Sequence, residues 1–259
     1  MGFNPFVLGE AVEKAVCVVR SGVVWRRYYR FRGGRWYGGI ATADCVGCNL
    51  RCGFCWSWRY GSFTTSAGRL YPPQEVVRRL EGIASRRGYR YVRVSGGEPT
   101  LCFEHLKQVI KGLGASGFVF ILETNGLVLG RDEGVVREVA NLGNVVVRVS
   151  LKGATPEEFS RLTGADPEFF NYQLRALENL LNAGMRPVEE FYPAVMISFT
   201  PPQNFKALKE ALARIHPDLA DNIDIELVIL YPHVKKLLKK TGLKPLKAVE
   251  PGRIPDFMI

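Results

Sequence analysis

The sequence lacks the segments that would place a protein in a membrane or carry it out of the cell. No run of about 18 apolar residues is present, so no membrane-spanning helix is expected. The first ten residues, MGFNPFVLGE, have no basic stretch followed by an apolar one, which argues against a secretory signal. Gly2 follows Met1, but Phe6 stands where a myristoylation signal has Ser or Thr. We therefore expect a cytoplasmic protein with no membrane partner.

Internal repeats and low-complexity stretches are also missing, which argues against a solenoid and against a largely disordered chain. The 259 residues suit one large α/β domain or two small ones, and 47% of them are hydrophobic, enough for a sizeable core. A net charge of +10 attracts anions such as nucleic acid, nucleotides or an acidic protein, but it does not select among them. The same charge is also explained by solubility alone.

The order of apolar patterns along the chain predicts an α/β fold. Two β-rich segments, 15–31 and 35–43, flank Arg32-Gly33-Gly34-Arg35, a sequence typical of a hairpin turn. Helical and strand patterns then alternate, which indicates a parallel sheet with helices outside, as an open doubly wound sheet or an incomplete barrel. Six strands are expected at 36–43, 89–95, 118–122, 145–151, 191–199 and 223–231, and helices at 73–87, 103–113, 132–141, 167–183 and 204–215.

Three regions follow from this pattern. Residues 1–35 form an N-terminal β-hairpin extension, 36–231 the alternating part, and 232–259 a basic tail with a short helix and an extended end. Pro193 restricts its strand to its first part, an edge or a bulge, because proline has no N–H for the ladder.

Six cysteines in a reducing compartment are expected to be metal ligands or free thiols rather than disulfides. Four of them fall within eleven residues, at Cys45, Cys48, Cys52 and Cys55. Structural zinc uses four ligands, commonly from two well-separated pairs, and here the pairs are only three residues apart. In the alternative, Cys48, Cys52 and Cys55 hold a cubane cluster whose fourth iron has no protein ligand, as reactive metal sites require.

The spacing Cys48-x3-Cys52-x2-Cys55, with the aromatic Phe54 before the last cysteine, resembles the signature of the radical S-adenosylmethionine (radical SAM) enzymes. The resemblance implies a partial (β/α)6 barrel, a [4Fe–4S] cluster and S-adenosylmethionine (SAM) as cosubstrate. It also implies reductive cleavage of SAM to a 5′-deoxyadenosyl radical and an electron donor such as ferredoxin or flavodoxin. Phe54 would lie beside the adenine. Cys45 has no counterpart in the motif, and the sequence assigns no role to it, to Cys17 or to Cys102.

Further motifs stand at the ends of expected strands. Gly96, Gly97 and Glu98, followed by Pro99, resemble the motif that binds the methionine ammonium in this family. Glu123 and Thr124, with Asn125 as a further candidate, stand where the family contacts the ribose or carboxylate.

The next strand ends in Ser150-Leu151-Lys152, and Lys152 would neutralise the methionine carboxylate. Glycyl-radical activating enzymes have Asp where Ser150 stands, so no role of that aspartate is carried over. The resemblance implies that the last two strands, of which one ends at Ser198 and the other contains Glu226, supply the adenine pocket largely through their backbone. Because the carboxyl ends of parallel strands share one edge, these groups are expected to meet there. No residue is assigned to act on the substrate itself.

The substrate is less defined than the radical chemistry. The motifs most resemble the group around pyruvate formate-lyase activating enzyme, so the first prediction is an activase that acts on a glycyl radical enzyme. The alternatives are a 7-carboxy-7-deazaguanine synthase-like enzyme and a tRNA-base-modifying enzyme. Outside enzymes, a structural metal-binding or RNA-binding protein is the competing class, and a ferredoxin is a weaker one because it needs four cysteine ligands.

Two sets of basic residues bear on the substrate. Residues 25–32, WRRYYRFR, interleave bases with aromatics, which suits RNA, although a twisted hairpin with its arginines outside is the preferred explanation. Arg93 and Arg148 share strand faces with Ser95 and Ser150, so one of them is expected to bind an anionic part of the substrate inside the barrel. None of the three histidines, His105, His216 and His233, falls in a motif.

Overall fold

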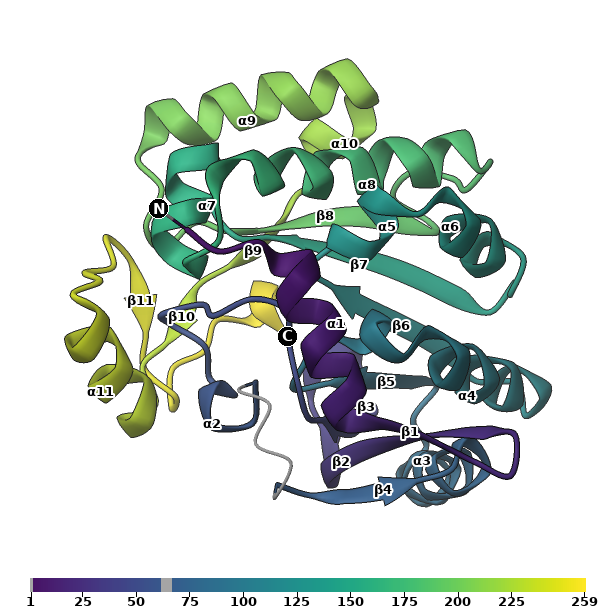
Figure 1. Cartoon of the computed structure of the whole chain (residues 1–259). Helices are drawn as coiled ribbons and strands as arrows, with labels where there is room; N and C mark the ends of the chain where they lie inside the picture. The colour runs from purple at the N-terminus through teal and green to yellow at the C-terminus, as the bar shows by residue number, and fades with distance from the viewer. Residues whose placement is uncertain (1, 62–66) are drawn as a thin grey trace.

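The computed structural model describes residues 2–61 and 67–259, and its centre is a nine-stranded sheet (Figure 1). Six strands run parallel in chain order, from β3 through β5, β6, β7 and β8 to β9, with helices between them. This arrangement confirms the predicted α/β fold with a mostly parallel sheet. The parallel strands are β3 (Ile40–Cys45), β5 (Tyr91–Ser95), β6 (Val119–Thr124), β7 (Val145–Leu151), β8 (Phe191–Met196) and β9 (Asp224–Glu226).

Helices cover the outer face of the curved sheet, as Figure 1 shows for α3, α4, α6, α8 and α9. Several expected boundaries are reproduced, whereas the helix expected at 167–183 begins with a short 3-10 turn, and α7 was not expected. The helices of this part are α2 (Trp58–Gly61), α3 (Pro73–Arg87), α4 (Phe103–Ala115), α5 (Leu127–Arg131), α6 (Glu133–Ala140), α7 (Pro156–Thr163), α8 (Phe170–Asn182), α9 (Pro202–Ile215) and α10 (Pro217–Asp221), with 3-10 turns η2 (Pro99–Cys102) and η3 (Pro167–Phe169).

The N-terminal part extends the same sheet. A helix, α1 (Pro5–Val16), precedes β1 (Cys17–Arg20) and the long β2 (Val23–Gly34), and β2 pairs antiparallel with β3 and with β4 (Arg69–Tyr71). The expected hairpin is therefore real, but its connection lies at residues 35–39, around η1 (Trp36–Gly38), and not at Arg32–Arg35. The strand expected over 15–31 is also wrong in part, because its start belongs to α1 and a second turn interrupts it.

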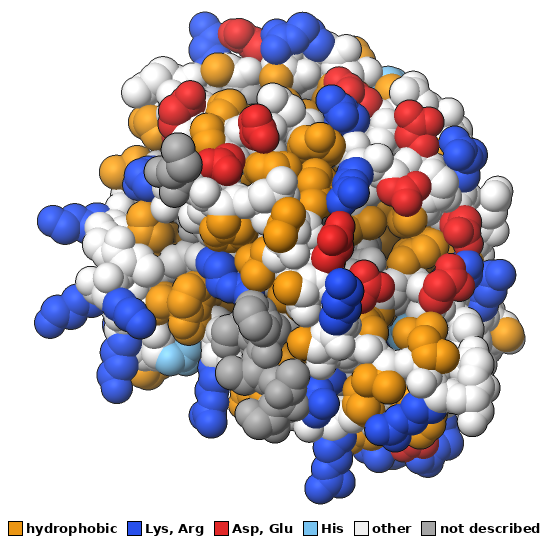
Figure 2. Space-filling view, in the orientation of Figure 1, with side chains coloured by type: hydrophobic (Ala, Val, Ile, Leu, Met, Phe, Trp, Pro, Cys, Tyr) orange, Lys and Arg blue, Asp and Glu red, His pale blue; other side chains and the backbone are white. Residues whose placement is uncertain are grey.

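The last expected strand is wrong in extent. Only β9 joins the main sheet, whereas β10 (Val228–Ile229) pairs with β11 (Ala248–Val249) in a small separate sheet. The following α11 (Pro232–Thr241) carries exposed lysines, which project at the lower left of Figure 2. The chain then returns to the sheet through η4 (Asp256–Met258), and the Tyr37 N–H donates to the Ile259 carbonyl. No helix of the described residues is both long and apolar enough to cross a membrane.

Pro193 lies inside β8 without breaking the sheet. It pairs with Val149 of β7 on one side, whereas β9 pairs with β8 only from Ala194 to Met196. Proline has no N–H, and at Pro193 no residue of β9 is paired with β8. The position is therefore an edge of the sheet on that side, as expected for proline in a strand.

The two faces of the sheet differ in polarity. One face packs against the helices through buried apolar side chains such as Val92, Leu122 and Val147. Because side chains alternate along a strand, the residues between them, including Arg93 and Arg148, point to the opposite, concave face. Both Arg93 and Arg148 therefore lie on the inner side of the sheet, as the hypothesis of an anion-binding arginine inside the barrel requires. The concave face is the polar surface on which the following site is built.

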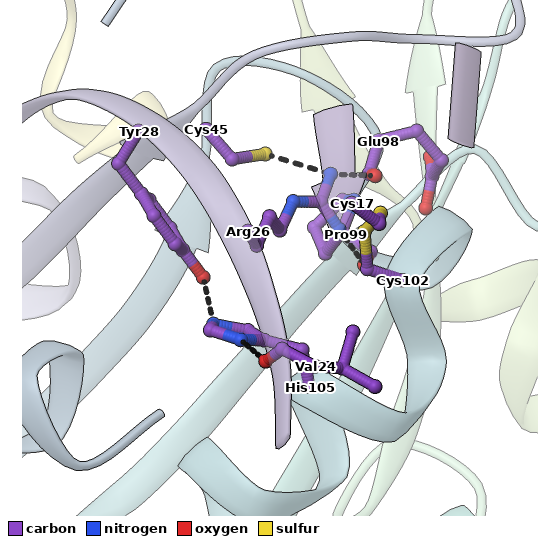
Figure 3. The surroundings of a disulfide bond; sticks show 9 residues. All are labelled: Cys17, Val24, Arg26, Tyr28, Cys45, Glu98, Pro99, Cys102 and His105. Carbon is purple, nitrogen blue, oxygen red and sulfur yellow. Dashed lines mark hydrogen bonds between the residues drawn. A yellow bond between two sulfur atoms is a disulfide. The ribbon is translucent and has the colours of Figure 1, made fainter. Parts of the chain in front are cut away.

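His105 is buried beneath the N-terminal strands and has a structural role (Figure 3). Its Nδ1 donates to the Val24 carbonyl over 2.8 Å, so its Nε2 accepts from the Tyr28 hydroxyl at 3.0 Å. Nε2 is the acceptor because burial favours the neutral imidazole. Burial, reinforced by the charge of Arg26, lowers the pKa of His105 to about 4, although the hydrogen bond to Val24 opposes the shift.

Acid should therefore destabilise the fold through His105. In the unfolded chain His105 is protonated below about pH 6.5, whereas in the folded chain it stays neutral down to about pH 4. The free energy of unfolding therefore falls by up to about 3 kcal/mol as the pH drops across that window. Urea unfolding of the cluster-free protein at pH 7 and pH 4.5 measures the loss. His105→Gln should flatten the dependence, and the more exposed His216→Gln should not. An unchanged pH dependence in His105→Gln would contradict this assignment.

Candidate functional site

The cysteine loop leaves the carboxyl end of β3 and is held by backbone contacts. The Gly47 N–H donates to the Tyr60 carbonyl, and the Gly53 N–H to the Leu162 carbonyl. Gly47 has φ +91°, and a Cβ there would meet the side chain of Val12 at 2.6 Å, so only glycine fits. The loop is thus built into the fold.

The side chain of Arg51 holds this loop together by hydrogen bonds to its backbone. Its Nη1 donates to the carbonyls of Cys48 at 2.7 Å, Leu50 at 2.9 Å and Gly61 at 3.2 Å. The guanidinium also lies within electrostatic reach of the three motif cysteines. Arg51 therefore shapes the cysteine loop and places a positive charge beside it, a role that the sequence analysis missed.

Cys48, Cys52 and Cys55 form no disulfide and interact electrostatically with one another. Burial raises the pKa of all three thiols, that of Cys52 to about 12. The cationic Lys152 opposes the shift at Cys52 and Cys55, whereas the Glu98 carboxylate adds to it at Cys48.

This donor set fits a cluster better than a single ion. In the described part of the chain, no three His, Cys, Asp or Glu side chains are gathered as ligands of one metal ion. A [4Fe–4S] cluster instead takes each thiolate on a different iron, so its ligands stand further apart. Three cysteines on one fixed loop, with cations beside them, suit that geometry.

The loop after β5 packs directly on the cysteine loop. The Glu98 N–H donates to the Gly47 carbonyl over 2.8 Å, and a Cβ on Gly97 would collide with the same carbonyl. Gly96 adopts φ +89° beneath Tyr29, whose hydroxyl would lie 3.0 Å from an added Cβ. The two glycines are therefore required by the close approach of the two loops.

The Glu98 carboxylate is buried and accepts four hydrogen bonds from the protein. Thr100 donates through its N–H at 3.2 Å and its hydroxyl at 2.8 Å, Thr124 through its hydroxyl at 2.7 Å, and Asn125 through its N–H at 2.8 Å. Glu98 and Thr124, both predicted as ligand-binding residues, are thus brought together. Their contact joins the loops after β5 and β6.

Glu123 faces the concave side, away from Thr124. It accepts from Arg93 Nη1 at 2.5 Å and from the Tyr37 hydroxyl at 2.8 Å. Burial would raise the pKa of Glu123, but Arg93 and then Arg148 lower it, with the net shift downward. The neighbouring residues Glu123 and Thr124 therefore make different contacts: Thr124 binds Glu98, and Glu123 binds residues of the concave face.

The ends of β7 and β9 form a compact ionic group. Arg148 pairs with Asp224 at 2.7 Å and with Glu226 at 2.6 Å, and Ser150 donates to Glu226 at 2.7 Å. Lys152 contacts the Ser150 hydroxyl and lies 3.4 Å from Glu226. Burial is the largest single influence on Lys152 and favours the neutral amine, but Glu226 and Cys52 together raise its pKa, so the ammonium stays charged.

Phe54 and Ser198, two further residues singled out in the sequence, are both buried. Phe54 is 8% exposed and packs against Phe199, with ring centroids 5.5 Å apart. The hydroxyl of Ser198 accepts from the Val228 N–H at 2.8 Å, which connects the segment after β8 to β10. Phe54 thus closes the site between the cysteine loop and the C-terminal segments.

The other three cysteines lie behind the loop after β5. Cys17 and Cys102 form a disulfide between the ends of α1 and η2, with Cα atoms 6.3 Å apart. The expectation that all six cysteines are ligands or free thiols is therefore wrong for this pair, because the fold brings residues 85 positions apart together. Cys45 is buried and accepts hydrogen bonds from Arg26 and from the Gly97 N–H, apart from Cys48, Cys52 and Cys55.

Arg26 was missed by the sequence analysis and is the centre of Figure 3. It is 1% exposed, and its guanidinium donates to the carbonyls of Pro99 at 2.5 Å and Glu98 at 2.7 Å. Its remaining contact, to Cys45 Sγ, measures 3.2 Å. This arginine contradicts the interpretation that the hairpin carries all its arginines outside, and its alternation with aromatics was the only signal.

Comparisons with known proteins agree with this geometry. The family model of the radical SAM superfamily matches residues 44–219. A protein of Thermococcus kodakarensis named as a probable GTP 3′,8-cyclase is 36% identical over 119 residues, covering 46% of this chain and 36% of the relative. The 7-carboxy-7-deazaguanine synthase of Hyperthermus butylicus is 35% identical over 125 residues, covering 46% of this chain and 51% of the relative.

The chain thus spans about half, or less, of the length of these relatives. Among solved structures, Streptococcus suis SuiB bound to S-adenosylmethionine matches with a TM-score of 0.55 at 16% identity, over 79% of this chain and 48% of that chain. This likeness concerns the fold alone. The family match, which covers most of the sheet, shows that the chain belongs to the radical SAM superfamily and is an enzyme of that family, with a [4Fe–4S] cluster and S-adenosylmethionine as its cofactors.

Proposed function

We propose that this enzyme binds the methionine part of SAM between the cysteine loop and the ends of β5 to β7, and abstracts hydrogen from a small purine-related heterocycle on the concave face. The main support for this proposal is that the buried thiols, the Glu98 loop and the charged Lys152 lie together at one edge of the sheet. Cys48, Cys52 and Cys55 would hold the cluster, which would supply the electron for reductive cleavage of SAM to methionine and the 5′-deoxyadenosyl radical. An external reductant has to supply that electron.

Lys152 is proposed to bind the methionine carboxylate. It lies within electrostatic reach of Cys52 and Cys55, and burial strengthens any ion pair that it makes. Ser150 and Glu226 hold its ammonium in place, so Ser150 acts here through Lys152. This arrangement gives the polar residue at position 150 a function without the aspartate of the activating enzymes.

Glu98 is proposed to act mainly by holding its loop. Its carboxylate already accepts four hydrogen bonds from Thr100, Thr124 and Asn125, so it fixes the backbone of Gly96 and Gly97 against the cysteine loop. The methionine ammonium would bind at this rigid backbone, next to Glu98. Phe54 would form the apolar wall for the adenine.

A purine-related substrate is favoured by the names of the relatives and by the concave face. GTP and 7-carboxy-7-deazaguanine, in those names, are polar heterocycles with an anionic group. The concave face offers charged residues, among them Arg93, Glu123 and Arg148, for such a molecule. No relative cited above is an activase, so the prediction of a glycyl radical enzyme partner is without support, while the deazaguanine synthase alternative is partly matched.

Anaerobic turnover tests this function. Cluster-loaded protein with dithionite and SAM should form 5′-deoxyadenosine, and a purine-related substrate deuterated at its reacting carbon should transfer deuterium into that product. Lys152→Met should raise the KM for SAM at least about tenfold, since a lost charged hydrogen bond costs about 1.5–3 kcal/mol. The surface variant Lys206→Met should leave the KM unchanged. Absence of 5′-deoxyadenosine from fully loaded protein would refute the proposal, and absence of deuterium transfer would refute its substrate class.

A further inference from the structure

Two arginines of β2 share a single buried carboxylate at the β2 side of the concave face. Arg30 Nε lies 2.6 Å from Asp44 Oδ2, and Arg32 contacts both carboxylate oxygens, at 2.8 Å and 3.1 Å. Asp44 is fully buried, whereas the side chains of Arg30 and Arg32 are 47% and 23% exposed. Two positive charges against one negative charge leave one positive charge facing the open side of the sheet.

The indole of Trp56 lies against the same two guanidinium groups. Its ring centroid is 5.9 Å from the guanidinium carbon of Arg30 and 5.8 Å from that of Arg32. Trp56 directly follows the cluster cysteine Cys55, and it is 40% exposed. Its carbonyl accepts from His233 Nε2 at 2.8 Å, so the backbone that carries the ring is fixed. An exposed aromatic ring is thus fixed beside an excess cation and next to the cysteine loop.

Elsewhere on the concave face, the positively charged side chains described next are paired with carboxylates. Arg93 is paired with Glu123, and Arg148 and Lys152 are paired with the two carboxylates of β9. Among the described side chains of this face, the excess positive charge therefore falls at Arg30 and Arg32. Fixing two arginines on a buried carboxylate also limits their rotamer freedom, which lowers the entropy cost of binding a ligand.

We propose that Arg30, Arg32 and Trp56 form a subsite for a planar heterocycle that carries an anionic group, a phosphate or a carboxylate. The anion would accept hydrogen bonds from the two guanidinium groups, and the ring would stack on the indole. This inference rests on the proposed function and specifies the substrate class. The subsite lies beside the cysteine loop, where a substrate has to be near the radical.

Binding of defined probes tests the subsite. Cluster-loaded protein is titrated under anaerobic conditions with GTP, 7-carboxy-7-deazaguanine, guanosine and inorganic triphosphate, with calorimetry as the readout. At least one of the first two should bind at least about tenfold more tightly than guanosine or triphosphate, because only these combine ring and anion. GTP and 7-carboxy-7-deazaguanine distinguish a phosphate from a carboxylate. No binding of either, or equal binding of all four, would overturn the proposal.

Variants then locate the binding. Arg32→Gln and Trp56→Leu should each weaken the favoured probe at least about tenfold, since each removes one half of the recognition. Arg35→Gln is the matched control, because Arg35 also lies against a tryptophan, Trp36, but shares no buried carboxylate in the described structure. Equal affinity of the wild type and both subsite variants would overturn the proposal.

The affinity for SAM and the slow formation of 5′-deoxyadenosine without substrate separate this proposal from the proposed function. Both should stay within about twofold of the wild type in Arg32→Gln and Trp56→Leu. A loss of SAM binding in these variants would assign the residues to the cosubstrate and overturn the subsite. If the wild type forms no 5′-deoxyadenosine but probe binding still depends on Arg32 and Trp56, the proposed function fails while the subsite stands.

Discussion

Replacing Cys52 by alanine should remove the cluster and abolish formation of 5′-deoxyadenosine. Cys52 belongs to the buried trio, and its loss leaves two thiols, too few to retain a cubane. Anaerobically reconstituted wild-type protein should contain about four irons and four sulfides per chain, with the broad absorbance of a [4Fe–4S] cluster. Cys52→Ala should contain less than about one iron and show no product above background.

Cys45→Ser is the matched control for this prediction. Cys45 is the fourth cysteine of the eleven-residue stretch, but it lies under the Glu98 loop, where its sulfur accepts from Arg26 and from the Gly97 N–H. Serine keeps an acceptor there, so iron content and product formation should be retained. Equal loss of iron from both variants would mean that Cys45 is also a ligand.

The strongly periodic elements could be predicted from the sequence. Residues 73–87 and 145–151 were expected as a helix and a strand, and α3 and β7 have those bounds. In both, burial follows the period of the element, so local pattern and tertiary packing agree. The order of six parallel strands followed from the same alternation.

The sequence pattern did not indicate helix α1, although the residues at its start are typical of a helix N-terminus. Asn4 caps the helix by accepting from two backbone N–H groups, and Pro5 occupies the first turn. The apolar residues at its end run without a break into β1, so the pattern Ala15–Val19 was assigned to a strand. Continuous apolar runs do not show where a helix becomes a strand.

The cysteine loop was visible in sequence because its residues are close together and chemically distinctive. The supporting residues were not visible, because a β-bulge decides where they point. Arg26, Arg30 and Arg32 would share one face of a regular strand, but the register shift between Tyr28 and Arg30 separates them. Arg26 therefore reaches under the Glu98 loop, and the other two reach the concave face.

The second large effect is expected at Arg26. Arg26→Gln should raise the KM for SAM at least about tenfold and lower the melting temperature, while iron content is retained. The guanidinium donates to two carbonyls, those of Glu98 and Pro99, and a shorter side chain leaves them buried without donors. The loop that packs on the cysteine loop would then lose the support on its buried side. Steady-state kinetics at a temperature where both proteins are folded measure the KM.

Two controls separate positioning of the loop from a general loss of stability. Arg20→Gln changes an exposed arginine of the same hairpin, which stacks on Trp25, and should leave the KM unchanged. Arg26→Lys keeps the charge but has a single donor group in place of the fork, so it should restore only part of the affinity. A lowered melting temperature with an unchanged KM for SAM would show that Arg26 is only structural. An altered KM in Arg26→Gln at full iron content would instead extend the SAM site to the hairpin, because the backbone that binds the methionine is held in place by the strand beneath it.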